Sequence, residues 1–479
     1  MGIDAIVIGS GPNGLTAAVE LARAGLQVEV YEAASSIGGG TRTQALTLPG
    51  FAHDVCSAVH PTGILSPYMS RLPLDQHGLE WVASGVSAAH PLLDGTAAVL
   101  AGSVEDTAAT LGKDGAAYTR LMAPFVRYGP QLLEQFLGPF RFPKPSLMLP
   151  TARFGLLGIP SAQRIAGLFY KDELAKGLFA GCAAHSILPL SWFGTGAVGL
   201  IFQLTAHLAA WPVARGGSHA ITKALTSYLK SLGGVIHTDS RVHDLHELPE
   251  HRAVVFDTSA RNMLEICGEA LPARYRSRVS RFRYGPGVFK VDWALDGPIP
   301  WAAPGCDTAS TVHVGGTLSD IARSEHAMYH GSVAEHPFLL VCQQSVLDKS
   351  RAPAGKHTGY AYCHVPAGYG HDLTERIEAQ IERFAPGFRD RILARAVMTP
   401  TMLEARNANY IGGSITGGVM DLRQLFTRPV ARWDPYSTPN QRIFLCSAST
   451  PPGGGVHGMC GFHAARSVLG KVFGKRDTA

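Results

Sequence analysis

Three groups of closely spaced glycines carry the strongest chemical signal in this sequence of 479 residues. The first, Gly9, Gly11 and Gly14, satisfies the pattern G-x-G-x-x-G directly after a short apolar run. These glycines allow a tight turn, a close approach of the backbone to a pyrophosphate and close helix packing, with the phosphates at the helix N-terminus. Glu32 could accept hydrogen bonds from both ribose hydroxyls and would repel a 2′-phosphate. The predicted dinucleotide site comprises Gly9, Gly11, Pro12, Asn13, Gly14 and Glu32.

A second glycine group follows the acidic residue, in the segment Gly38 to Thr43. Its backbone donors and the Arg42 cation could approach a pyrophosphate or a flavin. NAD dehydrogenases do not need such a loop, whereas FAD proteins of the glutathione-reductase-like class commonly have it. The two motifs together favour FAD as the cofactor, with a flexible surface loop as the alternative. The residues assigned to FAD here are Gly39, Gly40, Thr41 and Arg42.

The third group, Gly453 to Gly458, lies between a predicted strand and a predicted helix near the C-terminus. Backbone amides at a helix N-terminus stabilise negative charge, which a reduced flavin carries at its pyrimidine end. We therefore expect flavin contacts here, although a glycine-rich helix entry without a ligand has the same pattern. The candidate contacts are Gly454, Gly455, Val456 and His457.

Flavin chemistry on a carbon–carbon bond calls for few protein catalysts, because the cofactor accepts the hydride. Removal of a hydride next to a double bond leaves a cation that must lose a proton to a nearby base. The candidate bases are His457, in the third glycine group, and His60, shortly after the second. The sequence has 20 histidines, and a structural, hydrogen-bonded role is the alternative for each candidate.

The elements that would position these residues follow from the local patterns. Ile3 to Ile8, Leu15 to Ala24 and Val28 to Tyr31 predict a strand, a helix and a second strand, the start of a Rossmann-like FAD domain. We expect an α/β protein in which this glutathione-reductase-like domain is interleaved with a mixed-sheet substrate domain and a helical cap. The predicted segments are 1–71, 213–284 and 439–479 for the FAD domain, 72–212 for the helical cap and 285–438 for the substrate sheet.

Composition narrows the classes of partner. The net charge is +5, and no run of Lys and Arg interleaved with aromatic residues predicts nucleic-acid binding. Eight scattered cysteines suggest neither a metal site nor a disulfide framework. No secretory signal is visible, so we expect a cytoplasmic protein. A homo-oligomer or a protein partner stays open.

Residues 177–214 contain no Asp, Glu, Lys or Arg. Pro189 and several polar residues interrupt them, so we expect buried cap helices, with peripheral membrane contact as an alternative and a membrane span as a third. The segment Gly194 to Gly199 also spells G-x-G-x-x-G but has no acidic partner. We interpret it as close helix packing.

The order of these motifs resembles that of the phytoene desaturase-like family of FAD oxidoreductases, within the carotenoid desaturase and amine oxidase superfamily. The resemblance spans nearly the whole chain and also rests on the segments Gly50 to Asp54 with Ser57, Gly216-Gly217, Asn409 with Gly412-Gly413, and Pro451 to Gly461. The short segment His237 to His251, where carotenoid desaturases carry a β-hairpin, and the segment Gly285 to Trp293 place the chain nearer a different branch.

The family implies hydride transfer between flavin N5 and a carbon–carbon bond of a lipophilic, polyene- or isoprenoid-like substrate. An apolar cap would suit such a substrate, although Leu178, Phe179, Trp192, Phe193, Ile201 and Phe202 could equally fill a core. The alternatives are an amine oxidase, which needs an aromatic cage at the flavin, and an FAD-stabilised scaffold that acts through a protein partner.

Overall fold

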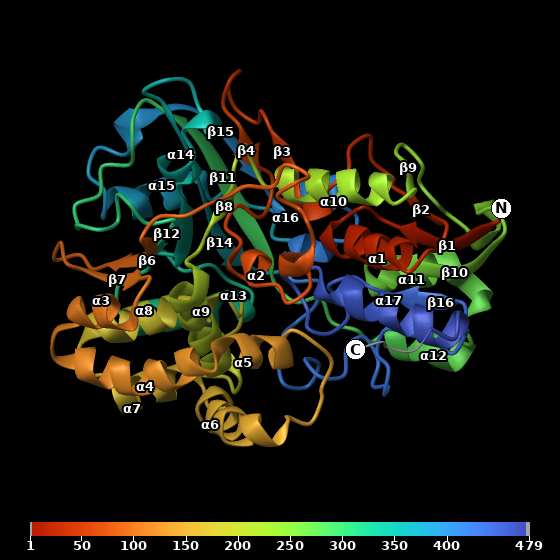
Figure 1. The fold of residues 1–479 in the computed structure, drawn as a ribbon. Coiled ribbons are helices and arrows are strands. Elements are labelled where there is room, and N and C mark those ends of the chain that lie inside the picture. Colours follow the sequence, from red (N-terminus) through yellow and green to blue (C-terminus); the bar gives the residue numbers. More distant parts are fainter. Residues whose placement is uncertain (1, 476–479) are drawn as a thin grey trace.

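The computed structural model describes residues 2–475 and arranges them around two β-sheets (Figure 1). The first sheet is parallel and has the order β16-β10-β1-β2-β9. Its strands come from the three chain segments predicted for the FAD domain. They are β1 (Ile3–Ile8), β2 (Val28–Tyr31), β9 (Val235–His237), β10 (His251–Phe256) and β16 (Ile443–Leu445).

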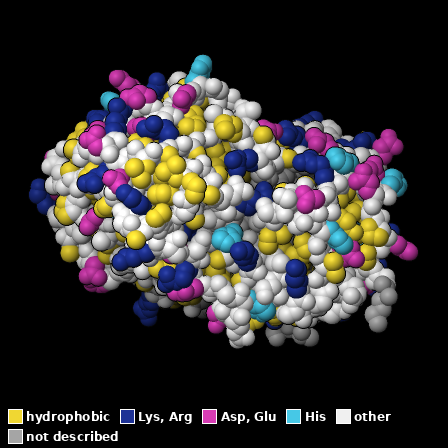
Figure 2. Space-filling view, turned by 90° about the horizontal axis from the view of Figure 1, so that it is seen from above, with side chains coloured by type: hydrophobic (Ala, Val, Ile, Leu, Met, Phe, Trp, Pro, Cys, Tyr) yellow, Lys and Arg dark blue, Asp and Glu magenta, His cyan; other side chains and the backbone are white. Residues whose placement is uncertain are grey.

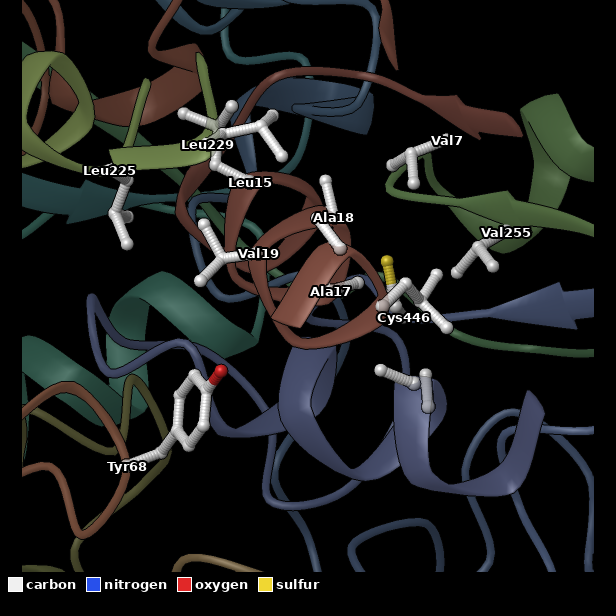
Figure 3. Close-up of a cluster of buried hydrophobic side chains, with 14 of the residues drawn as sticks. Val7, Leu15, Ala17, Ala18, Val19, Tyr68, Leu225, Leu229, Val255 and Cys446 are labelled. Carbon is white, nitrogen blue, oxygen red and sulfur yellow. The ribbon is translucent and has the colours of Figure 1, made fainter. Parts of the chain in front are cut away.

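Helix α1 (Pro12–Arg23) is the central helix of this domain because it packs on three neighbours at once. Its small residues Ala17 and Ala18 face the strands, whereas Leu15 and Val19 face Leu229 and Leu225 (Figure 3). α10 (His219–Ser231) and α17 (Met459–Val472) pack against α1, and the other helices of the domain are α2 (Pro61–Ile64), α11 (Ala260–Cys267) and α12 (Ala273–Val279). A buried helix of this kind fixes the position of the glycine turn that precedes it.

The second sheet is mixed and has the order β15-β11-β14-β13-β12-β6-β7. All neighbouring pairs are antiparallel except β12 and β6. The strands are β6 (Val86–Pro91), β7 (Ala97–Ala101), β11 (Gly287–Leu295), β12 (Thr311–Val314), β13 (Leu339–Cys342), β14 (His357–Val365) and β15 (Ile392–Met398). Its helices are α13 (Leu318–Tyr329), α14 (Gln344–Leu347), α15 (Thr374–Glu382) and α16 (Pro400–Arg406). Two short pairs, β3 (Thr43–Gln44) with β4 (His53–Asp54) and β5 (Trp81–Val82) with β8 (Val213–Ala214), complete the strands.

The segment 72–212, expected to be helical throughout, begins instead with strands. Both β6 and β7 belong to the mixed sheet, and helices follow only from Val104. β6 and β7 pair with each other as a local hairpin, and β6 joins this hairpin to the sheet by pairing with β12, more than 200 residues later in the chain. The cap helices are α3 (Val104–Ala109), α4 (Gly115–Arg127), α5 (Gly129–Phe136), α6 (Met148–Gly158), α7 (Ala162–Phe169), α8 (Glu173–Ala184) and α9 (Thr195–Ala209).

The uncharged stretch 177–214 forms most of α8 and all of α9, and many of its residues are buried in the cap core, as expected. A side chain at Gly196 would meet the Pro160 carbonyl oxygen at 2.7 Å, and one at Gly199 would meet the Phe179 ring at 3.0 Å. The second G-x-G-x-x-G is therefore confirmed as a helix-packing motif. Among residues 2–475, no helix is both long and apolar enough to cross a bilayer.

Candidate functional site

A single cavity of about 1350 Å³ connects the three glycine loops with the cap and the mixed sheet. Ligand pockets typically measure about 300–1,000 Å³, so this one has room for more than one small molecule. Every residue predicted to bind the cofactor lies on its wall except Gly14, and so does His60. The structure thus brings together residues that are separated by more than 440 positions in the sequence.

The three glycines of the first loop are packed too tightly to carry side chains. A Cβ at Gly14 would overlap the Gly9 carbonyl oxygen, and one at Gly11 would lie 2.5 Å from Asp257 Oδ2. Gly9 has φ +102°, a conformation that favours glycine. Helix α1 starts at Pro12, its N-cap residue Gly11 has no side chain to cap it, and its first turn contains no acidic residue. Its N-terminus is therefore open to an anion from the cavity side.

Glu32 is fixed at the end of β2 by four donors. Ser10 donates from its backbone N and from Oγ to Glu32 Oε2 at 3.0 and 2.6 Å. Ala34 N and Arg42 Nη2 donate to Oε1 at 2.9 and 3.3 Å. Ser36 accepts from the Arg42 guanidinium through its carbonyl oxygen. The carboxylate is thus held in one orientation at the cavity wall, as ribose binding requires.

The second glycine loop forms a short 3-10 helix, Gly39–Thr41, directly beside the first loop. A Cβ at Gly39 would lie 3.1 Å from Gly11 Cα, and one at Gly40 would overlap the Tyr410 hydroxyl. Because neither position can hold a side chain, only backbone faces the cavity between the two loops. This is the kind of surface that a pyrophosphate can approach closely.

The third glycine loop enters α17 through Gly458, which has φ +68°. His457 is buried, and its Nδ1 accepts a hydrogen bond from Met459 N at 3.0 Å. Its carbonyl oxygen accepts from Ser66 Oγ at 2.6 Å. Burial lowers the pKa of His457 to about 4, so the ring is neutral at physiological pH. With Nδ1 occupied as an acceptor, His457 orders the start of α17.

His60 is also buried on the cavity wall, at the start of α2. Its Nε2 lies 2.8 Å from Ser218 Oγ, which itself donates to the Ser57 carbonyl oxygen. Ser218 therefore accepts from Nε2–H, which leaves Nδ1 as the unprotonated nitrogen, 3.4 Å from Ser57 Oγ. Burial lowers the pKa of His60 to about 4. Its Nδ1 has the longer hydrogen bond, so His60 has the freer acceptor of the two histidines.

Several charged residues on the cavity wall were not predicted, and two of them, Asp257 and Lys290, make contacts that shape the site. Asp257 follows β10, and its Oδ2 accepts from Gly14 N at 2.8 Å, so it caps α1 from a neighbouring strand. Burial, with a smaller contribution from Glu32, raises the pKa of Asp257 to about 8. No local pattern reveals this contact, because it depends on β10 pairing with β1.

The second unpredicted residue is Lys290 in β11, which forms an ion pair with Asp292 and lies 4.2 Å from the centre of the Tyr360 ring. Both charged side chains are buried. Asp292 also lies 3.6 Å from His53 Nδ1 through its other oxygen. The signal was present in the sequence: a Lys and an Asp two positions apart in a strand lie on the same face.

The geometry fits an FAD molecule. Two glycine loops present backbone beside the N-terminus of α1, which is capped from another element by Asp257, a fixed carboxylate stands at the end of β2, and the cavity continues past the third loop toward the cap. The buried Asn13 Oδ1 beside this helix start has no partner within the described residues.

The chain is similar in sequence and fold to known oxidoreductases. Residues 7–72 match a family model described as "NAD(P)-binding Rossmann-like domain". The chain is 27% identical to mouse "Pyridine nucleotide-disulfide oxidoreductase domain-containing protein 2", over 97% of this chain and 93% of that protein. It is 23% identical to a phytoene dehydrogenase of Streptomyces griseus, over 86% and 80% of the two chains. A solved putrescine oxidase variant has the same fold, with a TM-score of 0.64, 17% identity and coverage of 99% of each chain.

Proposed function

We propose that this chain transfers a hydride between FAD and a carbon–carbon bond of a lipophilic, polyene- or isoprenoid-like substrate. The chain belongs to the superfamily of FAD oxidoreductases that contains carotenoid desaturases and amine oxidases. FAD is the cofactor. When bound, it accepts or supplies the hydride, and the protein contributes binding, orientation and the handling of a proton.

The observation that carries the proposal is the distribution of charge along the cavity. The acidic residues that line it are Glu32, Asp257 and Glu265, all from the FAD domain. The part of the wall that belongs to the cap and the mixed sheet has no carboxylate and is largely apolar and aromatic, with Phe202, Trp211, Leu340, Tyr360 and Tyr362 among its residues; its charged residues are Arg141, Lys290 and Arg406. Such a wall excludes water and fits an uncharged, extended substrate.

Lys290 argues against an amine as the substrate. An amine oxidase would offer aromatic faces to a substrate ammonium or amine, but the Tyr360 face here is covered by Lys290 at 4.2 Å. Because Lys290 occupies this ring face, a substrate ammonium cannot use it, and no carboxylate that lines the cap and sheet part of the cavity offers an ion pair instead. The names of two relatives, a phytoene dehydrogenase and a limonene dehydrogenase, specify unsaturated hydrocarbons and support the same substrate class.

In the desaturation direction, we assign proton removal to His60. Its low pKa does not prevent this role, because a carbocation next to a C–H bond is a far stronger acid than a protonated imidazole. Ser218 fixes the tautomer that leaves Nδ1 unprotonated. His457, whose Nδ1 is engaged by Met459 N, is the weaker candidate and keeps the third glycine loop in place.

The test is anaerobic absorption spectroscopy of the purified flavoprotein. Polyenes, isoprenoid hydrocarbons and amines are added to the oxidised protein, and the same compounds are added after photoreduction. Loss of the oxidised flavin band with a hydrocarbon, or its return when a polyene is added to the reduced protein, would support the proposal and give the direction. Bleaching by amines alone would instead establish an amine oxidase, and a flavin that responds to no compound would favour the scaffold.

The role of His60 is tested separately, with whichever compound reacts. His60→Asn removes the imidazole and should slow flavin reduction by roughly 10²–10⁴-fold, as loss of a general base does. His77→Asn is the matched control, because His77 is partly exposed and contacts Ser227, away from the cavity wall, and it should react as the wild type does. Equal rates for His60→Asn and the wild type, with equal flavin content, would exclude His60 as the base.

A further inference from the structure

Helix α6 (Met148–Gly158) has its apolar side turned outward. Leu149, Ala152, Leu156 and the following Ile159 lie at spacings of three and four residues, so they share one face, and all are exposed. Leu149 and Leu156 are 80% and 74% exposed. A surface helix of a globular protein normally turns polar residues to water. The only charged residue of α6, Arg153, donates to the Arg120 carbonyl oxygen and lies over the Phe125 ring instead of covering this face.

Aromatic residues extend the apolar surface beyond the helix. Phe140 and Phe142 are largely exposed, with ring centres 5.6 Å apart, and Phe426 lies 6.2 Å from Phe140. We call the surface formed by Phe140, Phe142, Leu149, Leu156, Ile159 and Phe426 the entrance face. Contiguous exposed apolar surfaces of this kind mark interaction sites on otherwise polar proteins.

The entrance face surrounds an opening of the cavity. Phe140, Ile159 and Phe426 line the cavity and are at the same time more than half exposed. Leu149 and Leu156 do not line it. These three side chains give the cavity an apolar wall that continues onto the entrance face.

The charged residues of the segment that contains α6 have one sign. Residues 135–171, which include α6, contain five Lys and Arg and no Asp or Glu. Arg141, Lys144 and Arg164 are exposed. The opposite side of the molecule, shown in Figure 2, carries acidic and basic side chains intermixed. An apolar helix face flanked by cations is the arrangement of interfacial helices that bind anionic lipids.

We propose that the entrance face docks on the surface of an anionic lipid bilayer, with α6 lying in the headgroup region and the cavity open to the acyl chains. A second copy of this chain fits the face less well. A two-fold contact would place the same surface of both subunits together and set this basic segment against its own copy. The docking does not depend on which reaction the flavin performs, and it places membrane contact on α6 and its flanks instead of on the uncharged stretch 177–214.

Co-sedimentation of the holoprotein with vesicles tests the proposal. We expect binding to vesicles of phosphatidylcholine with phosphatidylglycerol, weaker binding to phosphatidylcholine alone, and release at high salt. The double variant Leu149→Gln/Leu156→Gln should bind at least about tenfold more weakly, since two leucines no longer enter the bilayer. Arg141→Gln/Lys144→Gln should lose about fivefold per charge on the anionic vesicles only.

Leu393→Gln is the matched control, because Leu393 is an exposed leucine in β15, on the other side of the molecule in Figure 1. It should bind as the wild type does. Flavin content and circular dichroism establish that each variant is folded. Absence of binding to any vesicle, or equal binding by Leu149→Gln/Leu156→Gln and the wild type, would overturn the proposal. A dimer that this double variant dissociates, without vesicle binding, would overturn it as well and assign the face to a second copy.

Discussion

At the scale of single residues, the cofactor site combines neutral backbone with two carboxyl groups in different surroundings. Glu32 accepts hydrogen bonds from four donors, one of them the Arg42 guanidinium. Asp257 accepts from Gly14 N, and burial raises its pKa to about 8. A protonated Asp257 caps α1 without adding a negative charge beside the phosphates. Its protonation is therefore linked to both folding and FAD binding.

We predict that Asp257 makes the protein less stable as the pH rises. Its pKa is about 8 in the folded chain against 3.8 ordinarily, so between these values the folded state holds a proton that the unfolded state has lost. The free energy of unfolding then falls with rising pH, by up to about 1.4 kcal/mol per unit from this group. Asp257→Asn should remove this dependence and bind FAD more tightly at pH 8. Urea unfolding at pH 5 and pH 8 measures how the free energy of unfolding changes with pH, with the exposed Asp75→Asn as the control variant. An equal pH dependence in Asp257→Asn and the wild type would contradict the prediction.

A second prediction concerns the buried pair Lys290 and Asp292. Lys290→Met leaves Asp292 buried without its cation and should cost about 3–5 kcal/mol of stability. The double variant Lys290→Met/Asp292→Asn removes both charges and should recover most of that loss. Denaturant unfolding of the two single variants and the double variant gives the coupling energy directly. Additive effects would show that the ion pair does not stabilise this part of the cavity.

At the scale of elements, local sequence patterns predicted the strands and helices that carry their own turn signals. β1, α1 and β2 lie where glycine turns and apolar runs placed them, within a few residues, and β16 and α17 flank the third glycine group as predicted. β6 was not predicted, because the run Val-Ser-Ala-Ala-His-Pro has few β-branched residues and its strand character comes from its partners, β7 in a hairpin and β12 much later in the chain. The role of Asp257 could not be predicted for a similar reason. Its contact with Gly14 depends on the order of the strands in the sheet, which a local sequence pattern does not contain.

The packing of α17 on α1 allows a prediction about element positions. A Cβ at Gly461 would overlap the Asn13 carbonyl oxygen, so Gly461→Ala must push α17 away from the start of α1. We expect a loss of about 1–3 kcal/mol and weaker FAD binding, because the displaced segment includes the first glycine loop. Gly470→Ala is the matched control in the same helix: nothing lies within 4 Å of its Cβ, and it should stabilise the protein by about 0.5–1 kcal/mol. Thermal unfolding and FAD titration measure both variants. A Gly461→Ala variant with the stability and FAD affinity of the wild type would show that α17 can move away from α1 without cost.

At the scale of the whole molecule, the cavity is the place where three separated parts of the FAD domain meet the cap and the mixed sheet. Residues 9–42, 240–266 and 447–457 all contribute to its wall, together with Phe202 and Trp211 of the cap and Tyr360 and Tyr362 of the mixed sheet. FAD therefore contacts surfaces that the unfolded chain does not hold together. A ligand of this kind stabilises the folded state by an amount that grows with its free concentration.

We predict that removal of FAD lowers the stability of the whole folded chain. At a free FAD concentration about 1,000 times Kd, binding should add about 4 kcal/mol to the free energy of unfolding. The reconstituted protein should unfold in one transition at a higher Tm than the deflavinated protein. The deflavinated protein should also be cleaved more readily by proteases near residues 213–217 and 439–442, where the chain re-enters the FAD domain. Differential scanning calorimetry with limited proteolysis measures both effects. Equal Tm values with and without bound FAD would mean that the three segments are held together by their own packing, through α1 and the parallel sheet, and that the cofactor enters a domain already complete.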